Sequence, residues 1–290
     1  MKNRVYKKWN TQSIPEHCNK SLSFFYETPL GRFFLKFLVN RRISRIGGWL
    51  LNTSISSLFI SPVVSGTRIP LREYEKKRYT SYNDFFTRRI RKEMRKIDHH
   101  PDAFISPCDA KLTIYPVTEK GYYLIKGVPY RVRDLLGEDP VYSEYDGGYC
   151  MIFRLTVSDY HRYCYIDDGQ KGKNTFIPGV LHTVQPIAFR DHDVYRENCR
   201  EYTILSTEHF GDVVQVEVGA LLVGKIENRH QDYCYTRGEE KGNFAFGGST
   251  IVLLVKKGAV APDPAILSNT ENNLETLVRM GEKIGTGGKN

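Results

Sequence analysis

The sequence predicts an α+β protein in which a helical N-terminal region packs beside a β-rich, mostly antiparallel core. Apolar residues in the first hundred positions recur at helical spacing. From about residue 101 onward, short apolar runs alternate with glycine-containing turns. With 290 residues, the chain is long enough to bury a sizeable core. We therefore predict a helical, basic and apolar region over 1–100 and a β-rich core over 101–290.

The N-terminal region is apolar, aromatic and basic at once. One helix is predicted over residues 30–38, where five apolar side chains recur around Arg32 and Lys36. A second apolar stretch covers residues 46–60 and is expected to end at Pro62. Such stripes usually pack on a core, but a cation-rich helix pair can also lie in a membrane interface. Neither stretch reaches the ~18 apolar residues that a spanning helix needs.

A further helix is predicted over residues 81–97, where Phe85, Phe86 and Ile90 lie among basic residues. The basic run over 88–95 is expected to be its solvated face.

Three segments in the second part of the chain have the pattern of strands. Residues 150–155 and 251–255 are short apolar runs, typical of buried strands. Residues 212–227 alternate apolar and polar side chains before becoming more apolar. These segments predict the β-rich core.

Charge and cysteine content limit the classes of partner and site. The formal net charge of +9 favours an anionic partner such as a membrane surface, a phosphate-bearing substrate or nucleic acid. No nucleic-acid-binding motif accompanies the charge. The six cysteines form no CxxC pair, so neither a zinc site nor a disulfide framework is expected, and the setting is predicted to be reducing and cytoplasmic.

The run Gly247-Gly248-Ser249-Thr250 precedes the last predicted buried strand. It can be an ordinary turn. It can also be a site of self-cleavage, because a serine can attack the carbonyl of a preceding glycine, which has no side chain in the way and tolerates strained backbone angles.

A serine needs a base to take its proton, and a carboxylate commonly orients that base. Asp109 lies in the predicted turn Ser106-Pro107-Cys108-Asp109, where it could equally bond its own backbone. His161 lies in a loop after a predicted strand, where active-site residues are common. His182 follows a Pro-Gly turn that is expected to enter a strand, and a structural role suits it equally well.

Several motifs, taken together and in this order, resemble the phosphatidylserine decarboxylase proenzyme family, of the bacterial type with a Gly-Gly-Ser-Thr processing site. The resemblance covers roughly residues 81–258. The motifs that carry it are Ser81-Tyr82-Asn83-Asp84-Phe85-Phe86, Ser106-Pro107-Cys108-Asp109, Asp159-Tyr160-His161-Arg162, Gly219-Ala220-Leu221-Leu222-Val223-Gly224-Lys225-Ile226 and Gly247-Gly248-Ser249-Thr250.

The resemblance implies a self-processing decarboxylase that converts phosphatidylserine to phosphatidylethanolamine and CO2. Ser249 would attack the carbonyl of Gly248 and become an N-terminal pyruvoyl group, which forms a Schiff base with the substrate amine. The products would be a β chain, 1–248, and an α chain, 249–290. Asp109 and His161 would act as orienting acid and base. No metal is implied.

The sequence departs from the family at one position. Many members have a second histidine three residues after the first, assigned to self-cleavage, where this chain has Cys164. We favour His161 as the base, with His182 and Cys164 in reserve. His161 could instead serve mainly in decarboxylation, by protonating the carbanion.

The resemblance also implies partners and a location. The substrate would lie in an anionic membrane surface, and the enzyme would be peripheral on the cytoplasmic face of the cell membrane. The two chains would remain associated, with room for a homodimer and no role for nucleic acid. Two alternatives remain: a pyruvoyl decarboxylase of another amino-acid substrate, and a non-enzymatic, membrane-bound β-rich binding protein in which Gly247-Gly248 is merely a turn.

Overall fold

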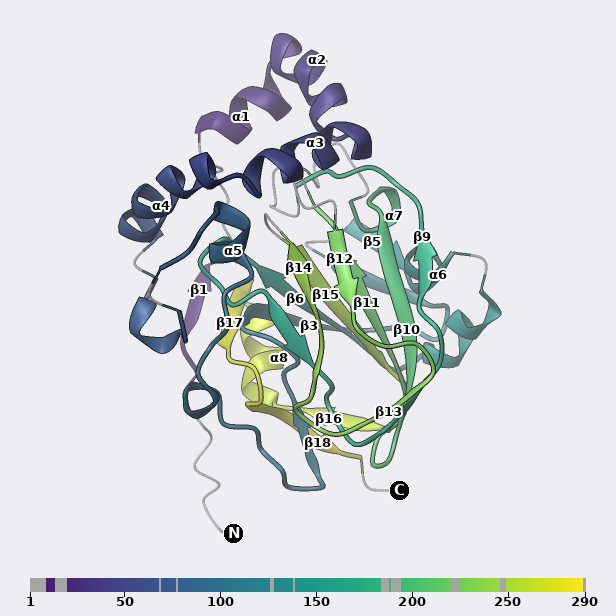
Figure 1. Ribbon diagram of the computed structural model, residues 1–290. Coiled ribbons are helices and arrows are strands. Elements are labelled where there is room, and N and C mark those ends of the chain that lie inside the picture. The colour runs from purple at the N-terminus through teal and green to yellow at the C-terminus, as the bar shows by residue number, and fades with distance from the viewer. Residues whose placement is uncertain are drawn as a thin grey trace.

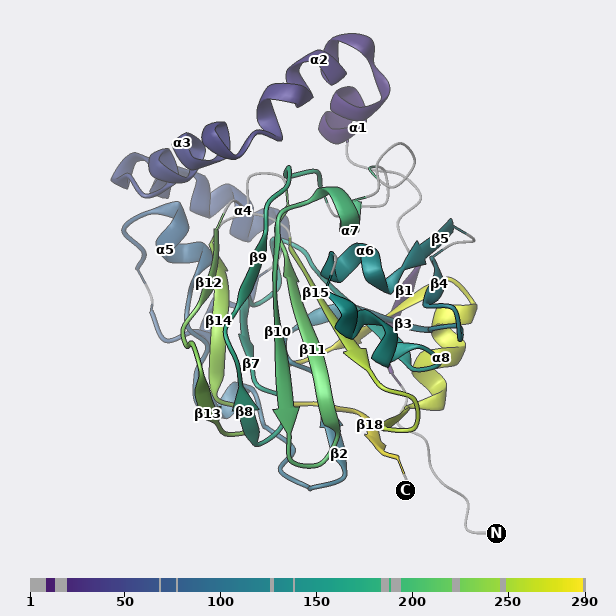
Figure 2. The same cartoon turned by 90° about the vertical axis from the view of Figure 1, so that its right-hand side faces the viewer.

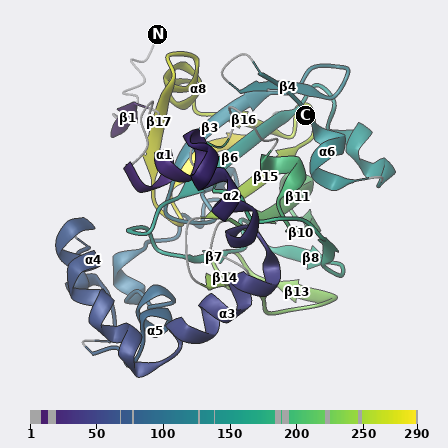
Figure 3. The same cartoon turned by 90° about the horizontal axis from the view of Figure 1, so that it is seen from above.

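The computed structural model describes residues 9–13, 20–67, 69–76, 78–125, 128–137, 139–183, 188, 194–220, 225–245 and 249–288. A layer of helices from the N-terminal part of the chain lies across one end of a body built from strands (Figure 1). Seen from above, these helices run in an arc over one side of that body (Figure 3). None of the helices in the described ranges is long and apolar enough to cross a membrane.

The helical layer confirms the helix predicted over residues 30–38 and corrects the role of Pro62. Thr28 caps the second helix by accepting a hydrogen bond from the amide of Gly31 at 3.0 Å. Pro62 lies in the first turn of the fourth helix, where its missing N–H leaves no bond unmade. The elements of the layer are α1 (Lys20–Glu27), α2 (Pro29–Leu38), α3 (Arg41–Leu51), the 3₁₀ helix Ser54–Phe59 and α4 (Ile60–Thr67).

The helix predicted over residues 81–97 is wrong in its length. Only α5 (Tyr82–Phe86) is α-helical, and Ile90 then forms an isolated antiparallel bridge with Tyr74. The basic run is not a solvated face either, because Arg88 and Arg95 are buried. The chain leaves the helix so that both guanidinium groups can reach acceptors inside the protein, and such tertiary contacts override local propensity.

One large antiparallel sheet organises the body, and it confirms the strands predicted at 150–155 and 251–255. In the described residues it has ten strands in the order β1-β17-β3-β6-β15-β11-β10-β8-β13, with β9 beside β10. Its strands are β1 (Thr11–Ser13), β3 (Ala110–Pro116), β6 (Tyr149–Leu155), β8 (Gly169–Lys171), β9 (Thr175–Ile177), β10 (Arg200–Thr207), β11 (Gly211–Val218), β13 (Tyr233–Tyr235), β15 (Ser249–Val255) and β17 (Leu274–Val278).

Both faces of the large sheet are covered, which explains why β15 is a continuous apolar run. Ile251 and Leu253 point into one hydrophobic cluster, and Val252 and Leu254 point into another. Figure 2 shows the small sheet β12-β14-β7 on one side of the large sheet and β4, β5 and α6 on the other. The covering strands are β4 (Tyr122–Ile125), β5 (Val128–Arg131), β7 (Arg162–Cys164), β12 (Lys225–Asn228) and β14 (Glu240–Ala245).

The remaining elements complete an α+β fold and confirm the predicted class. A third sheet has the strand order β16-β18-β2. The division at residue 100 stays a prediction, although β1 lies in the large sheet and precedes the helices. The elements are β2 (Ala103–Ile105), β16 (Val260–Pro262), β18 (Lys283–Gly287), α6 (Val132–Leu136), α7 (Val194–Glu197), α8 (Pro264–Glu271) and the 3₁₀ helices Leu71–Glu73, Lys92–Met94 and Pro140–Tyr145.

The helical layer is joined to the body by a few specific contacts. The amide of Tyr82 donates to Ser56 Oγ at 2.9 Å, and the amide of Leu181 donates to the carbonyl of Val39 at 3.1 Å. A third hydrophobic cluster, which includes Phe85 and Phe86, packs against side chains of α3 and α4. The layer therefore lies over the same end of the body as the loops described next.

Candidate active site

Three neighbouring strands bring the predicted site residues to one end of the large sheet. Asp109 immediately precedes β3, which pairs with β6, and β6 pairs with β15. Ser249, the first residue of β15, lies opposite Leu155, the last residue of β6. Because neighbouring strands are about 4.8 Å apart, Asp109 and Ser249 are separated by roughly 10 Å across the sheet.

His161 lies beside the strand that leads into the predicted cleavage site. It ends the loop that follows β6, and its carbonyl accepts a hydrogen bond from the amide of Phe244 in β14 at 2.9 Å. Residues 246–248, which include the predicted cleavage residue Gly248, lie outside the described residues. The loop from Leu155 to His161 thus connects β6, the strand beside Ser249, with β14, the strand that ends immediately before residue 246.

The ring of His161 is held in one orientation. It is 1% exposed and lies against the ring of Phe86, with the ring centroids 4.0 Å apart. Its Nδ1 is 3.0 Å from the carbonyl oxygen of Asp159. Since a carbonyl oxygen only accepts, Nδ1 is the donor in this hydrogen bond, and in the neutral ring Nε2 carries the lone pair.

The side chain of Asp159 fastens the loop that carries His161. Its Oδ2 accepts from Lys111 Nζ at 2.5 Å, from the amide of Thr156 at 2.6 Å and from Thr156 Oγ1 at 2.8 Å. The acid of the Asp-Tyr-His-Arg motif therefore shapes the loop. The sequence motif contained Asp159, but nothing in the sequence indicated that Lys111, on a different strand, would be its partner.

Asp109 is held by an arginine. Arg95 donates to both of its carboxylate oxygens, with Nε–Oδ1 at 2.8 Å and Nη2–Oδ2 at 2.5 Å, and the amide of Met280 donates to Oδ1 at 2.9 Å. In the described part of the chain, no hydrogen bond joins Asp109 to His161. The family resemblance implies that Asp109 orients the histidine, whereas within the described residues the acceptor of the His161 Nδ1–H is the carbonyl of Asp159.

The partners of Arg95 make it a fixed cation. Its Nη1 also donates to Glu73 Oε2 at 3.1 Å. Burial opposes the charge, but the hydrogen bonds and attraction of Asp109 and Glu73 outweigh it, and the pKa of Arg95 is raised. Sequence reasoning missed this residue because it lies in a basic run that resembles an exposed helix face.

Ser249 is buried, and its hydroxyl makes no hydrogen bond within the described residues. Buried hydroxyls nearly always have a partner, because desolvation without compensation costs about 1–3 kcal/mol. The hydroxyl of Ser249 could be consumed in a reaction without breaking any hydrogen bond to the described residues. The position therefore suits a serine that becomes a different chemical group.

His182, the first reserve base, lies between the helical layer and the body. Its Nδ1 is 3.3 Å from Tyr26 Oη of α1, and its Nε2 is 3.7 Å from Glu197 Oε2. The side chain of Asn198 links the backbone of His182 to the carbonyl of Gly219. Within the described residues 178–183, Val180 forms a single parallel bridge with Asn198, and the rest of the strand expected here lies outside the described residues.

Cys164, the second reserve base, is poorly suited to accept a proton. It is 1% exposed in β7, and its amide donates to the carbonyl of Pro107 at 2.9 Å. Burial, together with smaller contributions from the nearby carboxylates of Asp109 and Glu240, raises the pKa of its thiol to about 12. A thiol with this pKa stays protonated at neutral pH, so the geometry favours His161.

A polar cavity of about 510 Å³ adjoins the end of β3. Asp109, Lys111, Asp159 and Arg95 are among its lining residues. The charged groups that support the site are therefore next to space that water can enter. No group of three or more metal-ligating side chains occurs in the described ranges of the chain.

Residues 82–286 match the family model described as phosphatidylserine decarboxylase. The chain belongs to the phosphatidylserine decarboxylase family. The resemblance inferred from the motifs is thus confirmed, and the protein is an enzyme of that family.

Curated relatives of the family match nearly the whole chain. "Phosphatidylserine decarboxylase proenzyme 2" from Clostridium acetobutylicum is 46% identical over 271 residues, which is 93% of each chain. "Phosphatidylserine decarboxylase proenzyme" from Clostridium botulinum is 36% identical and covers 92% of each chain. The relative of the same name from Desulfitobacterium hafniense is 36% identical and covers 92% of this chain and 91% of its own.

Proposed function

We propose that this protein decarboxylates phosphatidylserine to phosphatidylethanolamine and CO2, after cutting its own chain between Gly248 and Ser249. The observation that carries the proposal is the hydroxyl of Ser249. It is buried, has no hydrogen-bond partner within the described residues and begins a central strand next to the loop of His161. Membership of a family named for this reaction supports the substrate.

The proposed self-cleavage consists of ester formation, elimination and hydrolysis. Ser249 Oγ attacks the carbonyl carbon of Gly248, its proton passes to His161, and the amide nitrogen takes up a proton as an ester replaces the peptide bond. Removal of the Ser249 Cα proton then breaks the Cβ–O bond and releases Gly248 as a carboxylate. Water then replaces the nitrogen of the remaining dehydroalanine and ammonia leaves. The α chain is left with a pyruvoyl group at its N-terminus.

The surroundings of position 249 fit a pyruvoyl group, because the serine hydroxyl has no hydrogen bond to lose there. Such a group supplies the electron sink that removal of CO2 from an amino acid requires. Because the ring of His161 is buried and packs on Phe86, the proton that it takes up from Ser249 at Nε2 would be shielded from water. His161 is our candidate for both proton transfers, and His182 remains the reserve.

Asp109 contributes to this site through Arg95. The bidentate ion pair and the Met280 amide fix the start of β3, the strand whose Lys111 holds Asp159. We infer that Asp109 stabilises the frame in which the loop carries His161. Its effect on the histidine is therefore indirect.

We also propose that the enzyme works as a peripheral protein on the cytoplasmic face of an anionic membrane. The layer exposes large apolar side chains, among them Phe33 (55% exposed), Trp49 (67%) and Leu58 (74%). Arg32 and Lys36 are exposed beside them in α2. Apolar surface with adjacent cations suits the interface of an anionic bilayer. In the same helix Leu35 is buried, so part of the stripe packs on the core, and the membrane-interface interpretation is proposed for its exposed part.

The two chains made by cleavage are expected to stay together. The α chain would begin with β15, which lies between β11 and β6 in the middle of the large sheet. Its β17 pairs with β3, and its β18 pairs with β2. Hydrogen bonds on both sides of a buried central strand oppose dissociation.

Denaturing mass spectrometry of the freshly purified protein tests the proposal. We expect fragments 1–248 and 249–290, with the second lighter by one ammonia than simple hydrolysis would make it. Ser249→Ala should remain a single chain and be inactive. An intact wild-type chain would overturn self-cleavage and favour the binding-protein alternative.

Substrate assays separate the remaining enzyme alternative. Release of CO2 from phosphatidylserine in vesicles is expected, and none from free serine. If only a different amino-acid substrate released CO2, cleavage would stand and the lipid assignment would fail.

A further inference from the structure

Arg88 is a buried arginine without a carboxylate partner in the described part of the chain. It is 2% exposed, and no ion pair to it occurs there. Burying an unpaired charge is costly, so such a residue needs other compensation. Its position two residues after α5 puts it next to the loop that carries His161.

Backbone carbonyls and aromatic rings compensate this charge. Nη2 donates to the carbonyls of Ser158 at 2.9 Å and Asp159 at 2.8 Å, and Nη1 lies 3.4 Å from the carbonyl of Phe85. The guanidinium carbon lies 4.6 Å from the ring centre of Tyr74 and 4.9 Å from that of Phe85. A planar group with five donors can satisfy this arrangement, whereas a lysine ammonium cannot.

One of these carbonyls, that of Asp159, also accepts a hydrogen bond from His161, the candidate catalytic histidine. The oxygen of Asp159 accepts from Arg88 Nη2 at 2.8 Å and from His161 Nδ1 at 3.0 Å. Both lone pairs of that oxygen are therefore used by residues of the site. If this carbonyl turned away, His161 would lose the acceptor that keeps its proton on Nδ1.

We propose that Arg88 is a positioning residue for the self-cleavage and decarboxylation proposed above. It anchors the Asp159 carbonyl, which holds His161 as the Nδ1–H tautomer and leaves Nε2 to accept the proton of Ser249. The inference rests on the proposed function for its catalytic consequence, but the tautomer itself does not.

The loop is clamped at residue 159 from two sides. Lys111 and Thr156 hold the carboxylate of Asp159, while Arg88 holds its carbonyl. The carboxylate clamp fixes the course of the loop. The hydrogen bond from Arg88 fixes the direction in which the Asp159 carbonyl points, and therefore the acceptor position for His161 Nδ1. Apart from His161 itself, no other described side chain donates to this carbonyl.

Nitrogen NMR of histidine-labelled Ser249→Ala protein tests the first step without any cleavage. The ring-nitrogen shifts of His161, assigned by comparison with Ser249→Ala/His161→Gln, should report the Nδ1–H tautomer. A predominant Nε2–H tautomer would overturn the proposal. This measurement needs no change at Arg88 and does not depend on whether the wild-type chain cuts itself.

Arg88→Lys in the same background tests the second step, since it keeps the positive charge but lacks the planar guanidinium group and its five N–H donors. We expect a mixture of the two tautomers at His161. The control is Arg237→Lys, because Arg237 is also buried and donates to the carbonyls of Asp98, His100 and Pro101, and it differs from Arg88 in its ion pair with Asp167. An unchanged His161 tautomer in Arg88→Lys would contradict the role of Arg88.

Cleavage kinetics of precursor made by cell-free synthesis connect the tautomer to function. Arg88→Lys should cut itself about tenfold to a hundredfold more slowly than wild type, a usual result of misplacing a reacting group. Arg237→Lys should cut at the wild-type rate. If wild type does not cut, the proposed function fails; if Arg88→Lys cuts normally, only the present inference fails.

Discussion

At the residue scale, the site is set by carbonyl and carboxylate acceptors that fix basic side chains. Asp109 and Asp159 each accept three or more hydrogen bonds, from Arg95 and Met280 in one case and from Lys111 and Thr156 in the other. Neither carboxylate is left to act as a free base. In the proposed self-cleavage, the proton transfers depend on the side chains of His161 and Ser249.

Exchange of the candidate bases tests this assignment. His161→Ala should slow self-cleavage by about 10²-fold or more, the usual contribution of a positioned general base. Cys164→Ala should cut within about twofold of wild type, because a thiol with a pKa of about 12 is almost entirely protonated at neutral pH. Gel analysis of freshly synthesised precursor measures both rates.

Two results would contradict the assignment. A Cys164→Ala precursor that fails to cut while it unfolds at the wild-type temperature would return the base role to the thiol. Normal cutting by His161→Ala would shift the role to His182.

At the element scale, the helical layer and the central strand β15 differ in how far their apolar side chains are buried. The layer buries few apolar side chains and exposes many, in contrast to β15, whose seven residues are all buried. An exposed apolar surface of this kind marks a site of interaction. The strand, in turn, begins at Ser249, which lies opposite the last residue of β6, just before the loop of His161.

Vesicle flotation tests the interaction surface of the layer. The double variant Phe33→Ser/Phe37→Ser should bind anionic vesicles at least about tenfold more weakly, since full burial of one phenylalanine contributes about 1.5–3 kcal/mol. Raising the salt concentration should weaken wild-type binding, because the proposed mode of binding brings cations of the layer against anionic headgroups and salt screens this attraction.

Phe176→Ser is the matched control for flotation. Phe176 is 43% exposed, and it lies on β9 of the large sheet, outside the helical layer. Its replacement should leave vesicle binding unchanged. Equal loss of binding in both variants would contradict a specific membrane face.

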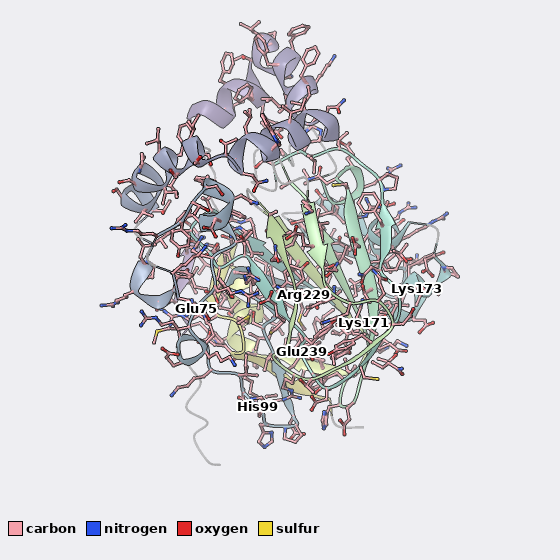
Figure 4. All side chains as sticks on the ribbon, in the orientation of Figure 1. Glu75, His99, Lys171, Lys173, Arg229 and Glu239 are labelled. Carbon is pink, nitrogen blue, oxygen red and sulfur yellow. The ribbon has the colours of Figure 1, made fainter. Side chains whose placement is uncertain are left out.

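At the scale of the whole molecule, buried charges join the sheets. Glu217 of β11 and Lys241 of β14 have fully buried side chains and form an ion pair at 2.7 Å between the large and the small sheet. Lys171 is nearby in this charged interior and donates to Asn174 Oδ1 at 2.7 Å and to the carbonyl of His230 at 2.6 Å. In Figure 4 it lies within the strand body below the helical layer.

Lys171 makes stability depend on pH. Burial, and then the like charge of Lys241, lower its pKa from 10.5 to about 8. Between these values the unfolded chain binds more protons, so the free energy of unfolding rises with pH. Relative to Lys171→Met, wild type should gain roughly 2 kcal/mol between about pH 8 and pH 10 in urea unfolding.

Lys173→Met is the control for this titration, because Lys173 is exposed two residues further along the chain (Figure 4). Its unfolding free energy should track that of wild type across the pH range. A constant difference between wild type and Lys171→Met would show that Lys171 does not titrate in this window.

The sequence alone was sufficient for the family, the α+β class, the main strands and the candidate residues Asp109, His161 and Ser249. These depend on local patterns: alternation and apolar runs report burial, and the order of short motifs reports ancestry. The predicted length of the helix over 81–97 was wrong, because the spacing of the buried arginines in this segment is the same as that of arginines on an exposed helix face.

Only the tertiary structure decided which groups meet. Arg95 and Asp109 are 14 positions apart, Arg88 and Asp159 are 71 apart, and Met280 and Asp109 are 171 apart. Hydrogen-bond partners at such separations depend on which strands and loops lie side by side, and no local periodicity encodes that. The sequence therefore determined which residues are candidates for the reaction, and the packing of β3, β6, β15 and α5 decided how His161 is held near the segment where cleavage is proposed.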